Sequence, residues 1–226
     1  MQARKLAVEG AIEFTPRVFP DDRGLFVSPF QEEAFAEARG GPLFRVAQTN
    51  QSLSKRGVVR GVHYTTTPPG TAKYVYCARG KALDIVVDIR VGSPTFGRWD
   101  AVLLDQRDHR AVYFPVGVGH AFVSLEDDTT MWYLMSTAYV AENELALSVL
   151  DPVLGLPIDV GADIEPLLSD RDRVAVTLAE AERQGLLPDY ATSLELERQL
   201  SGITHDRHGG PLDDIDRRVR TSLLSK

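Results

Sequence analysis

The 226-residue sequence contains a single cysteine, Cys77, so an internal disulfide cannot form. It lacks any apolar run approaching the roughly 20 residues that a membrane-spanning helix needs. Its basic start, Met1 to Leu6, is followed by neither the apolar block nor the small-residue site of a secretory signal. Acidic residues outnumber basic ones by 32 to 25, and the formal net charge of −7 argues against a nucleic-acid surface. We therefore expect a soluble, cytoplasmic protein that contacts no membrane and no nucleic acid.

The chain does have the composition of an ordinary globular domain, with 43% hydrophobic and 25% charged residues. Its length suits one domain with a full core, or one domain with an appendage. Turn signals recur at short intervals between brief apolar stretches, as at Asp21–Gly24, Pro68–Gly70 and Gly92–Pro94. This punctuation is typical of an all-β sandwich or barrel.

Residues 81–90 give the clearest strand pattern, because their side chains alternate between two types. One face has Leu83, Ile85, Val87 and Ile89, and the other has Ala82, Asp84, Val86 and Asp88. We predict that the first face is core and that the second carries carboxylates. A short helix is predicted over residues 32–39.

The composition changes after about residue 176, where helix signals replace strand signals. Thr177–Glu180 and Thr192–Glu195 are capping-box patterns, and Gly185 follows the first where a helix would stop. After a Gly-Gly-Pro breaker, helical spacing returns at Leu212, Ile215, Val219 and Leu223. These patterns predict a main domain over residues 1–190 and a helical C-terminal extension over residues 191–226.

Two histidines stand beside glycines in strand-like surroundings: His63 in Arg-Gly-Val-His-Tyr and His120 in Gly-Val-Gly-His-Ala-Phe. Neither has the spacing of a metal-ligand motif. A lone histidine is most often a hydrogen-bonded structural residue, and a proton-transfer site is the sharper hypothesis.

Longer motifs resemble the dTDP-4-dehydrorhamnose 3,5-epimerase family from about residue 3 to residue 190. In chain order they are Gln48–Ser54, Arg60–Tyr64, Lys73, Val87–Gly97 and Ser169–Asp172. The chain looks most like the branch that serves antibiotic deoxysugar pathways, which includes dTDP-4-keto-6-deoxyhexose 5-epimerases. The resemblance implies a mainly β, cupin-type double-stranded β-helix, or jelly roll, with short C-terminal helices. It also implies a homodimer that binds a dTDP-4-keto-6-deoxy sugar without a metal or cofactor.

The family's reaction removes a proton beside a ketone and returns one to the opposite face of the same carbon. It requires a base, an acid across the ring and a group that stabilises the oxyanion. By resemblance, His63 is the base, Asp172 orients it and holds its proton, Tyr133 is the opposite-face acid, and Lys73 lies near the developing enolate. Without the resemblance, Tyr133 would be read as a core aromatic and Lys73 as a surface charge.

The resemblance also assigns the substrate-binding side chains. They are Arg23, Arg60 and Gln48 for the phosphates or sugar, Asn50 and His120 nearby, Phe26 and Tyr139 around the thymine, and Phe19 and Arg171 in addition. In the family, the segment that holds Arg23 and Phe26 reaches the pocket of the neighbouring subunit, which implies the dimer. The structural alternative is that Arg23 pairs with Asp21 or Asp22.

Two positions depart from the family pattern. Ser28 stands where a glutamate commonly contacts the thymine edge, and Leu156 stands where many members have tryptophan before a proline. The first change puts one base contact in doubt. The second predicts an altered sugar pocket and, with the branch resemblance, faster inversion at C5 than at C3.

Three alternatives stay open beside epimerisation. A metal-dependent cupin needs a His-X-His pair, whereas Tyr64 and Thr65 follow His63 in this chain. A dTDP-4-keto-6-deoxyhexose 3,4-ketoisomerase would share the fold and the nucleotide but would move the carbonyl. A non-catalytic sugar-nucleotide-binding cupin would exchange no substrate proton with solvent.

Overall fold

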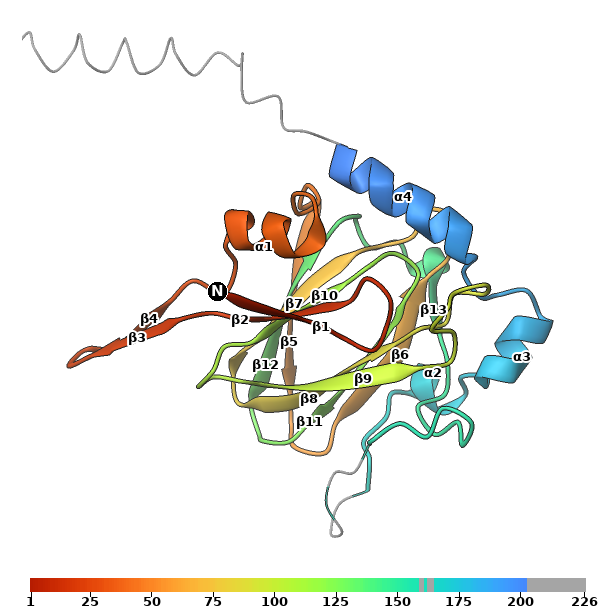
Figure 1. Cartoon of the computed structure of the whole chain (residues 1–226). Helices are drawn as coiled ribbons and strands as arrows, with labels where there is room; N and C mark the ends of the chain where they lie inside the picture. Colours follow the sequence, from red (N-terminus) through yellow and green to blue (C-terminus); the bar gives the residue numbers. More distant parts are fainter. Residues whose placement is uncertain (159–160, 162–164, 203–226) are drawn as a thin grey trace, which may run out of the picture.

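The computed structural model describes residues 1–158, 161 and 165–202 (Figure 1). In this part of the chain, two antiparallel sheets enclose an apolar layer to which both contribute. A two-stranded hairpin projects from one side of the body (Figure 1). The arrangement confirms the all-β architecture that the turn signals predicted and the jelly roll that the family resemblance implied. No helix within the described residues is long and apolar enough to cross a membrane.

The larger sheet has six strands, in the order β1 (Gln2–Lys5), β2 (Ile12–Thr15), β10 (Ala111–Phe114), β7 (Lys73–Arg79), β12 (Thr129–Met135) and β5 (Gln48–Ser54). The smaller sheet has five, in the order β13 (Glu144–Ala146), β6 (Val59–Thr65), β11 (Gly119–Ser124), β8 (Lys81–Val87) and β9 (Trp99–Asp105). The projecting hairpin is β3 (Val18–Asp21) with β4 (Gly24–Val27). The helices are α1 (Glu32–Arg39), α2 (Asp170–Arg173), α3 (Leu178–Arg183) and α4 (Tyr190–Gly202), and a 3-10 turn, η1 (Ala141–Asn143), precedes β13.

Apolar side chains gather in three layers, one between the sheets and one on the outer face of each. The middle layer includes Val75, Val86 and Phe122. The segment 147–158 and α3 cover the outer face of the smaller sheet. Helices α1 and α4 cover the outer face of the larger sheet (Figure 1). The central strands of both sheets are therefore buried on two sides, and a polar group deep between them, such as Asp84, is removed from solvent.

Strand β8 shows the predicted alternation, but its polar face is not a solvent face. Asp84 lies between the sheets and is only 2% exposed. The strand ends at Val87, short of the predicted end at residue 90. Beyond it, Asp88 and Arg90 form a buried ion pair with 2.8 Å between Nη2 and Oδ2. The prediction of one core face was too narrow, because the larger sheet covers the face of β8 that has Asp84, while segment 147–158 and α3 cover the face that has Ile85 and Val87.

Helix α1 spans the predicted residues, 32–39, and ends at Gly40, whose φ of +85° suits glycine. The capping box at Thr177 is present, because its side chain accepts from the backbone N–H of Glu180 and the Glu180 side chain accepts in return. Helix α3 ends at residue 183, before Gly185, as predicted.

Helix α4 begins at Tyr190, two residues before the predicted cap. Asp189 Oδ1 accepts hydrogen bonds from both the backbone N–H and the hydroxyl of Thr192, at 2.8 Å each. Asp189 thus takes the capping role that the pattern gave to Thr192. The predicted helix around Leu212, Ile215, Val219 and Leu223 lies outside the described residues, and the division at residue 190 stays a prediction.

Candidate active site

A cavity of about 230 Å³ opens between the two sheets. Most of the predicted site residues line it, namely His63, Lys73, Tyr133, Asn50, Arg60, His120 and Tyr139. Three others stand behind the lining: Asp172 bonds His63, Gln48 bonds Asn50, and Arg171 donates to the Leu145 carbonyl. These residues come from six separate segments, so the fold brings together what the motifs scatter along the chain.

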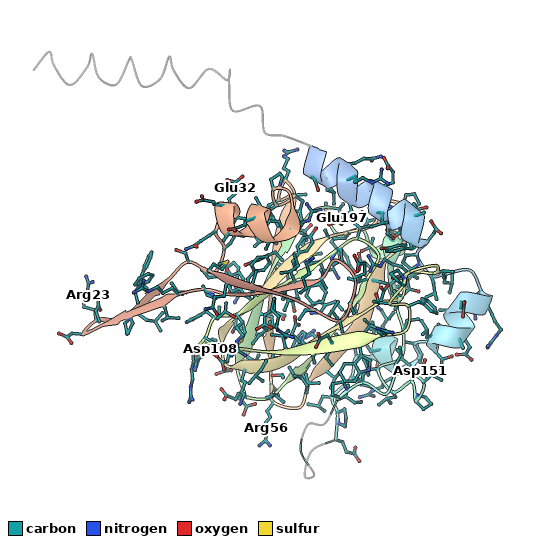
Figure 2. The ribbon with its side chains drawn as sticks, viewed as in Figure 1. Arg23, Glu32, Arg56, Asp108, Asp151 and Glu197 are labelled. Atoms are coloured by element: carbon teal, nitrogen blue, oxygen red, sulfur yellow. The ribbon has the colours of Figure 1, made fainter. Side chains whose placement is uncertain are left out.

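A larger cavity, of about 570 Å³, lies under α4 and holds none of the predicted residues. Its arginines are paired within the protein: Arg90 with Asp88, Arg39 with Glu197, and Arg198 with Glu195. Figure 2 shows Glu197 on α4, facing the body of the molecule. The smaller cavity therefore carries the titratable groups that chemistry needs.

An irregularity in β6 turns two functional side chains to the same side. Arg60 and His63 are three residues apart, so a regular strand would point them to opposite faces. The register with β11 shifts here, and His63 lies opposite His120 while Arg60 lies opposite Phe122. Because the shift changes the phase by one residue, both side chains line the cavity.

The bulge depends on Gly61. Its φ is +126°, and an added Cβ would lie 2.5 Å from the Cβ of Ala121 and 2.6 Å from the His120 carbonyl oxygen. A side chain would push β6 away from β11, so glycine is required at this close approach. The glycine between the arginine and the histidine of the motif therefore sets the geometry of the site.

His63 is tied to Asp172, with 2.7 Å between Nε2 and Oδ1. Burial lowers the pKa of His63 below its ordinary value, and the bond and charge of Asp172 oppose this effect. The imidazole is therefore neutral at neutral pH and still has a counter-charge for the proton that it accepts. This is the electrostatic setting of a general base.

Asp172 sits in the first turn of α2 and is 2% exposed. Its own backbone N–H bonds the Ser169 hydroxyl, which caps the helix. Burial would raise its pKa, but the hydrogen bond from His63, the charge of His63 and donors from Ser169 and the Gly61 backbone hold the pKa below its usual value. Asp172 is thus a stable anion with several donors.

Lys73 and Tyr133 approach the cavity from the larger sheet, opposite the sheet that holds His63. Lys73 makes no ion pair within 4.0 Å among the described residues. Burial lowers its pKa, while the charges of Glu144 and Asp84 raise it. The Tyr133 hydroxyl lies 3.1 Å from Ser52 Oγ, and burial raises its pKa, so it keeps its proton. A substrate in the cavity would lie between His63 and Tyr133.

The structure adds two carboxylates that the motifs did not single out. Asp84 bonds His120, with 2.6 Å between Oδ1 and Nε2. Glu144 lines the cavity and accepts a 2.8 Å hydrogen bond from the Thr65 hydroxyl. Asp84 stood out in the alternation of residues 81–90, and its burial was the missing information. Glu144 carried no signal in the sequence.

The hairpin residues lie apart from this cavity. Phe19 is 47% and Phe26 is 69% exposed, and neither lines it. Arg23 is near the tip of the hairpin, away from the body (Figure 2), and its Nη2 pairs with Asp21 Oδ2 at 2.5 Å. In the single chain, Arg23 therefore makes the ion pair with Asp21 that was the structural alternative to phosphate binding.

The two departures also have positions in the structure. Leu156 belongs to the apolar layer over the outer face of the smaller sheet and is absent from the cavity lining. The expectation that it alters the sugar pocket directly is therefore wrong. Ser28 follows β4, at the base of the hairpin. Among the described residues, no three His, Cys, Asp or Glu side chains are grouped in a way that could hold a metal ion.

Comparison with known proteins gives consistent matches over most of the chain. A family model described as dTDP-4-dehydrorhamnose 3,5-epimerase matches residues 5–180. The dTDP-4-dehydro-6-deoxyglucose 3-epimerase of a Streptomyces species is 51% identical over 185 residues, which cover 82% of this chain and 93% of that protein.

Two solved structures are similar in fold and sequence. The RmlC epimerase of Mycobacterium tuberculosis has a TM-score of 0.85 and 42% identity, covering 88% of this chain and 100% of that one. ChmJ, a 3'-monoepimerase of Streptomyces bikiniensis solved with dTDP-quinovose, has a TM-score of 0.81 and 48% identity, covering 88% and 98%. Both likenesses cover most of this chain.

Proposed function

The chain belongs to the dTDP-4-dehydrorhamnose 3,5-epimerase family, and we propose that it epimerises a dTDP-4-keto-6-deoxyhexose at C3, C5 or both. The product would serve deoxysugar biosynthesis for an antibiotic or another glycosylated natural product. One observation carries the proposal: a carboxylate-backed histidine and a protonated tyrosine face one cavity from opposite sheets. Epimerisation requires a base and an acid on opposite faces of the same carbon.

The reaction begins with loss of a proton beside the C4 ketone. Because Nε2 of His63 bonds Asp172, Nδ1 is the nitrogen that accepts this proton. The electron pair of the C–H bond moves to the carbonyl oxygen and forms an enolate. Asp172 stabilises the imidazolium, and the Lys73 ammonium stabilises the enolate oxygen.

Tyr133 completes the inversion. Its hydroxyl donates a proton to the opposite face of the carbon, the enolate returns to a ketone, and the tyrosinate and imidazolium exchange protons with solvent. The carbonyl stays at C4 throughout. Acid-base groups placed in this way contribute about 10²–10⁴-fold each, and an oxyanion stabiliser contributes a comparable factor.

The rim of the cavity suits a nucleotide. Gln48 links Asn50 and the backbone N–H of Tyr139, at 2.6 and 2.9 Å. The Tyr139 ring is 56% exposed and offers a face for a base to stack on. Arg60, held by Ser54, and Arg171 supply positive charge for phosphates.

We also propose a homodimer. Phe19, Arg23 and Phe26 lie on a projecting hairpin and do not line the cavity of their own chain, so no ring of this hairpin meets Tyr139 there. A partner's hairpin would supply that ring. Arg23 would exchange the exposed carboxylate of Asp21 for a phosphate, a substitution that costs little because the present ion pair is solvated.

We propose that C3 is inverted faster than C5. The relative at 51% identity is named a 3-epimerase, and ChmJ is a 3'-monoepimerase, so these names favour C3. This proposal replaces the expectation that C5 is inverted first. That expectation depended partly on Leu156, which does not line the cavity.

The test is incubation with dTDP-4-keto-6-deoxyglucose in deuterium oxide, followed over time by NMR at C3 and C5. Deuterium at C3 before C5, with an inverted C3, is the expected result. Label at C5 first would reverse the regiochemical proposal. Carbonyl migration would identify a ketoisomerase, and absence of exchange would identify a binding protein.

A further inference from the structure

His120 and Asp84 form a second histidine–carboxylate pair, buried deeper than the first. The side chain of His120 is 6% exposed and that of Asp84 is fully buried. They come from β11 and β8, neighbouring strands of the smaller sheet. The His120 ring packs on Phe114, with 4.2 Å between ring centroids, and lies 6.0 Å from the ring of Tyr133.

The Asp84 carboxylate lacks a donor on one side. Its Oδ2 is buried and has no hydrogen-bond partner. Among the described residues, only one other buried side-chain nitrogen or oxygen, His109 Nε2, also has none. Another buried carboxylate is fully paired: Asp88 accepts hydrogen bonds from Arg90, Ser93 and Thr95. An orphaned carboxylate oxygen is costly, so its retention indicates a use for the charge.

The titratable and charged groups around Asp84 come from several strands. The Asp84 charge acts on Lys73 and Cys77 on β7 and on Tyr133 on β12, and its Oδ1 bonds His120 on β11. Arg60 and His63 on β6 and Glu144 on β13 line the same cavity as Lys73, Tyr133 and His120. Lys73 is the buried cation of this group and has no ion-pair partner within 4.0 Å among the described residues. Two carboxylates, Glu144 and Asp84, raise its pKa from a distance, and the charge of Arg171 lowers it.

We propose that Asp84 is a positioning residue of the epimerase site, which orients His120 and supplies the buried negative charge that keeps Lys73 an ammonium ion. This inference rests on the proposed function. An ionised carboxylate only accepts hydrogen bonds, so Nε2 of His120 is protonated and donates its hydrogen bond to Asp84. Nδ1 of His120 is then free for an oxygen of the sugar.

The charge on Lys73 decides the pH dependence. The lysine must be protonated to stabilise the enolate, and burial already lowers its pKa. Glu144 and Asp84 raise that pKa, so removing the charge of Asp84 lets it fall further. Activity is lost as the pH rises through the pKa of Lys73. The alkaline limb of the rate profile therefore moves to lower pH when Asp84 is neutralised.

The experiment compares Asp84→Asn with wild type and with Asp108→Asn. Asparagine keeps the shape of the side chain and removes its charge. Asp108 is half-exposed, pairs with Arg110 and lies outside the cavity lining, so it controls for loss of one negative charge (Figure 2). The measurement is kcat/KM for epimerisation from neutral to alkaline pH, with dTDP affinity measured by calorimetry.

We expect Asp84→Asn to shift the alkaline limb down by about one pH unit and to lower kcat/KM at alkaline pH by roughly tenfold more than at neutral pH. The dTDP affinity should stay within about threefold. Asp108→Asn should follow wild type. An alkaline limb that is the same in wild type and Asp84→Asn would overturn the proposal.

A second measurement needs neither turnover nor a variant. Nitrogen-15 NMR of wild type labelled at lysine and histidine reports the ionisation of Lys73 and the tautomer of His120. A protonated Lys73 at neutral pH and a proton on Nε2 of His120 are expected. A neutral Lys73, or an unprotonated Nε2, overturns the inference. If wild type epimerises nothing, the proposed function fails instead, and these spectra still report on Asp84.

Discussion

His63 and His120 lie opposite each other on neighbouring strands, and Nε2 of each bonds an aspartate, at 2.7 and 2.6 Å. The surroundings of the two carboxylates differ. Asp172 is held at a helix N-terminus and receives hydrogen bonds from several donors. Asp84 receives one and has an oxygen without a partner. The exposed fractions differ too, at 31% for the His63 side chain and 6% for that of His120.

This difference in surroundings suits the two histidine–aspartate pairs to different roles. A general base must contact the substrate. When it accepts a proton, the aspartate beside it must stay a stabilised anion. His63 can do so because its aspartate is already stabilised by protein donors. His120 is confined between Phe114 and Tyr133, which suits orientation of a bound oxygen. The following predictions test how far the two pairs differ.

The largest effect is expected for His63→Ala. It should lower kcat/KM by about 10³–10⁴-fold and abolish deuterium exchange, while dTDP binds within about threefold of wild type. The reason is that the base acts in the transition state, whereas the phosphates are held by other residues. Time-resolved NMR in deuterium oxide and calorimetry provide the two readouts.

His120→Ala is the matched control for this comparison. It should slow turnover but retain exchange, because the base is still present. The assignment of different roles to the two histidines would be wrong if kcat/KM of His63→Ala stayed within tenfold of wild type, or if His120→Ala alone stopped deuterium exchange.

A smaller loss is expected for Tyr133→Phe, which removes the proposed acid and leaves the proposed base, His63. Inversion should fall by about 10²-fold, whereas deuterium should still enter the substrate from the His63 side. The pKa of Tyr133 is raised by burial, so its hydroxyl stays a proton donor over the whole working range of pH. The ratio of exchange to inversion, measured by NMR, should rise. Equal losses of both would remove Tyr133 from its proposed role.

The next effect, about tenfold to a hundredfold, is expected for Asp172→Asn. His63 must be neutral to accept a proton, so activity rises as the pH increases through its pKa. Asp172 raises that pKa against the effect of burial. Its loss lets the pKa fall, and the acid limb of kcat/KM moves to lower pH while the plateau drops. An acid limb that stays in place would show that another group sets it.

Part of this arrangement could be predicted from the sequence. The short helix at residues 32–39 and the capping box at Thr177 depend on neighbouring residues, and local patterns sufficed. The residues assigned by family resemblance, such as His63 and Tyr133, converge on one cavity.

The rest depends on contacts between distant segments. The bulge at Gly61 is defined only by its partner strand, and the burial of Asp84 depends on the second sheet. Glu144 reaches the site because β13 pairs with β6. Leu156 was misplaced for the same reason: its position in the chain did not reveal which face of the smaller sheet it covers.

The smallest effect is expected from metal removal. A cupin metal site needs neutral imidazoles with free nitrogens that converge on one point, together with a carboxylate. Here Nε2 of each cavity histidine is committed to its own aspartate, and Thr65 stands where the second histidine of a His-X-His pair would be. Exhaustive chelation should therefore leave kcat/KM within about twofold of the untreated enzyme. Should chelation abolish activity and a divalent ion restore it, the two histidines would have to share a metal, and their separation into a base and an orienting group would no longer hold.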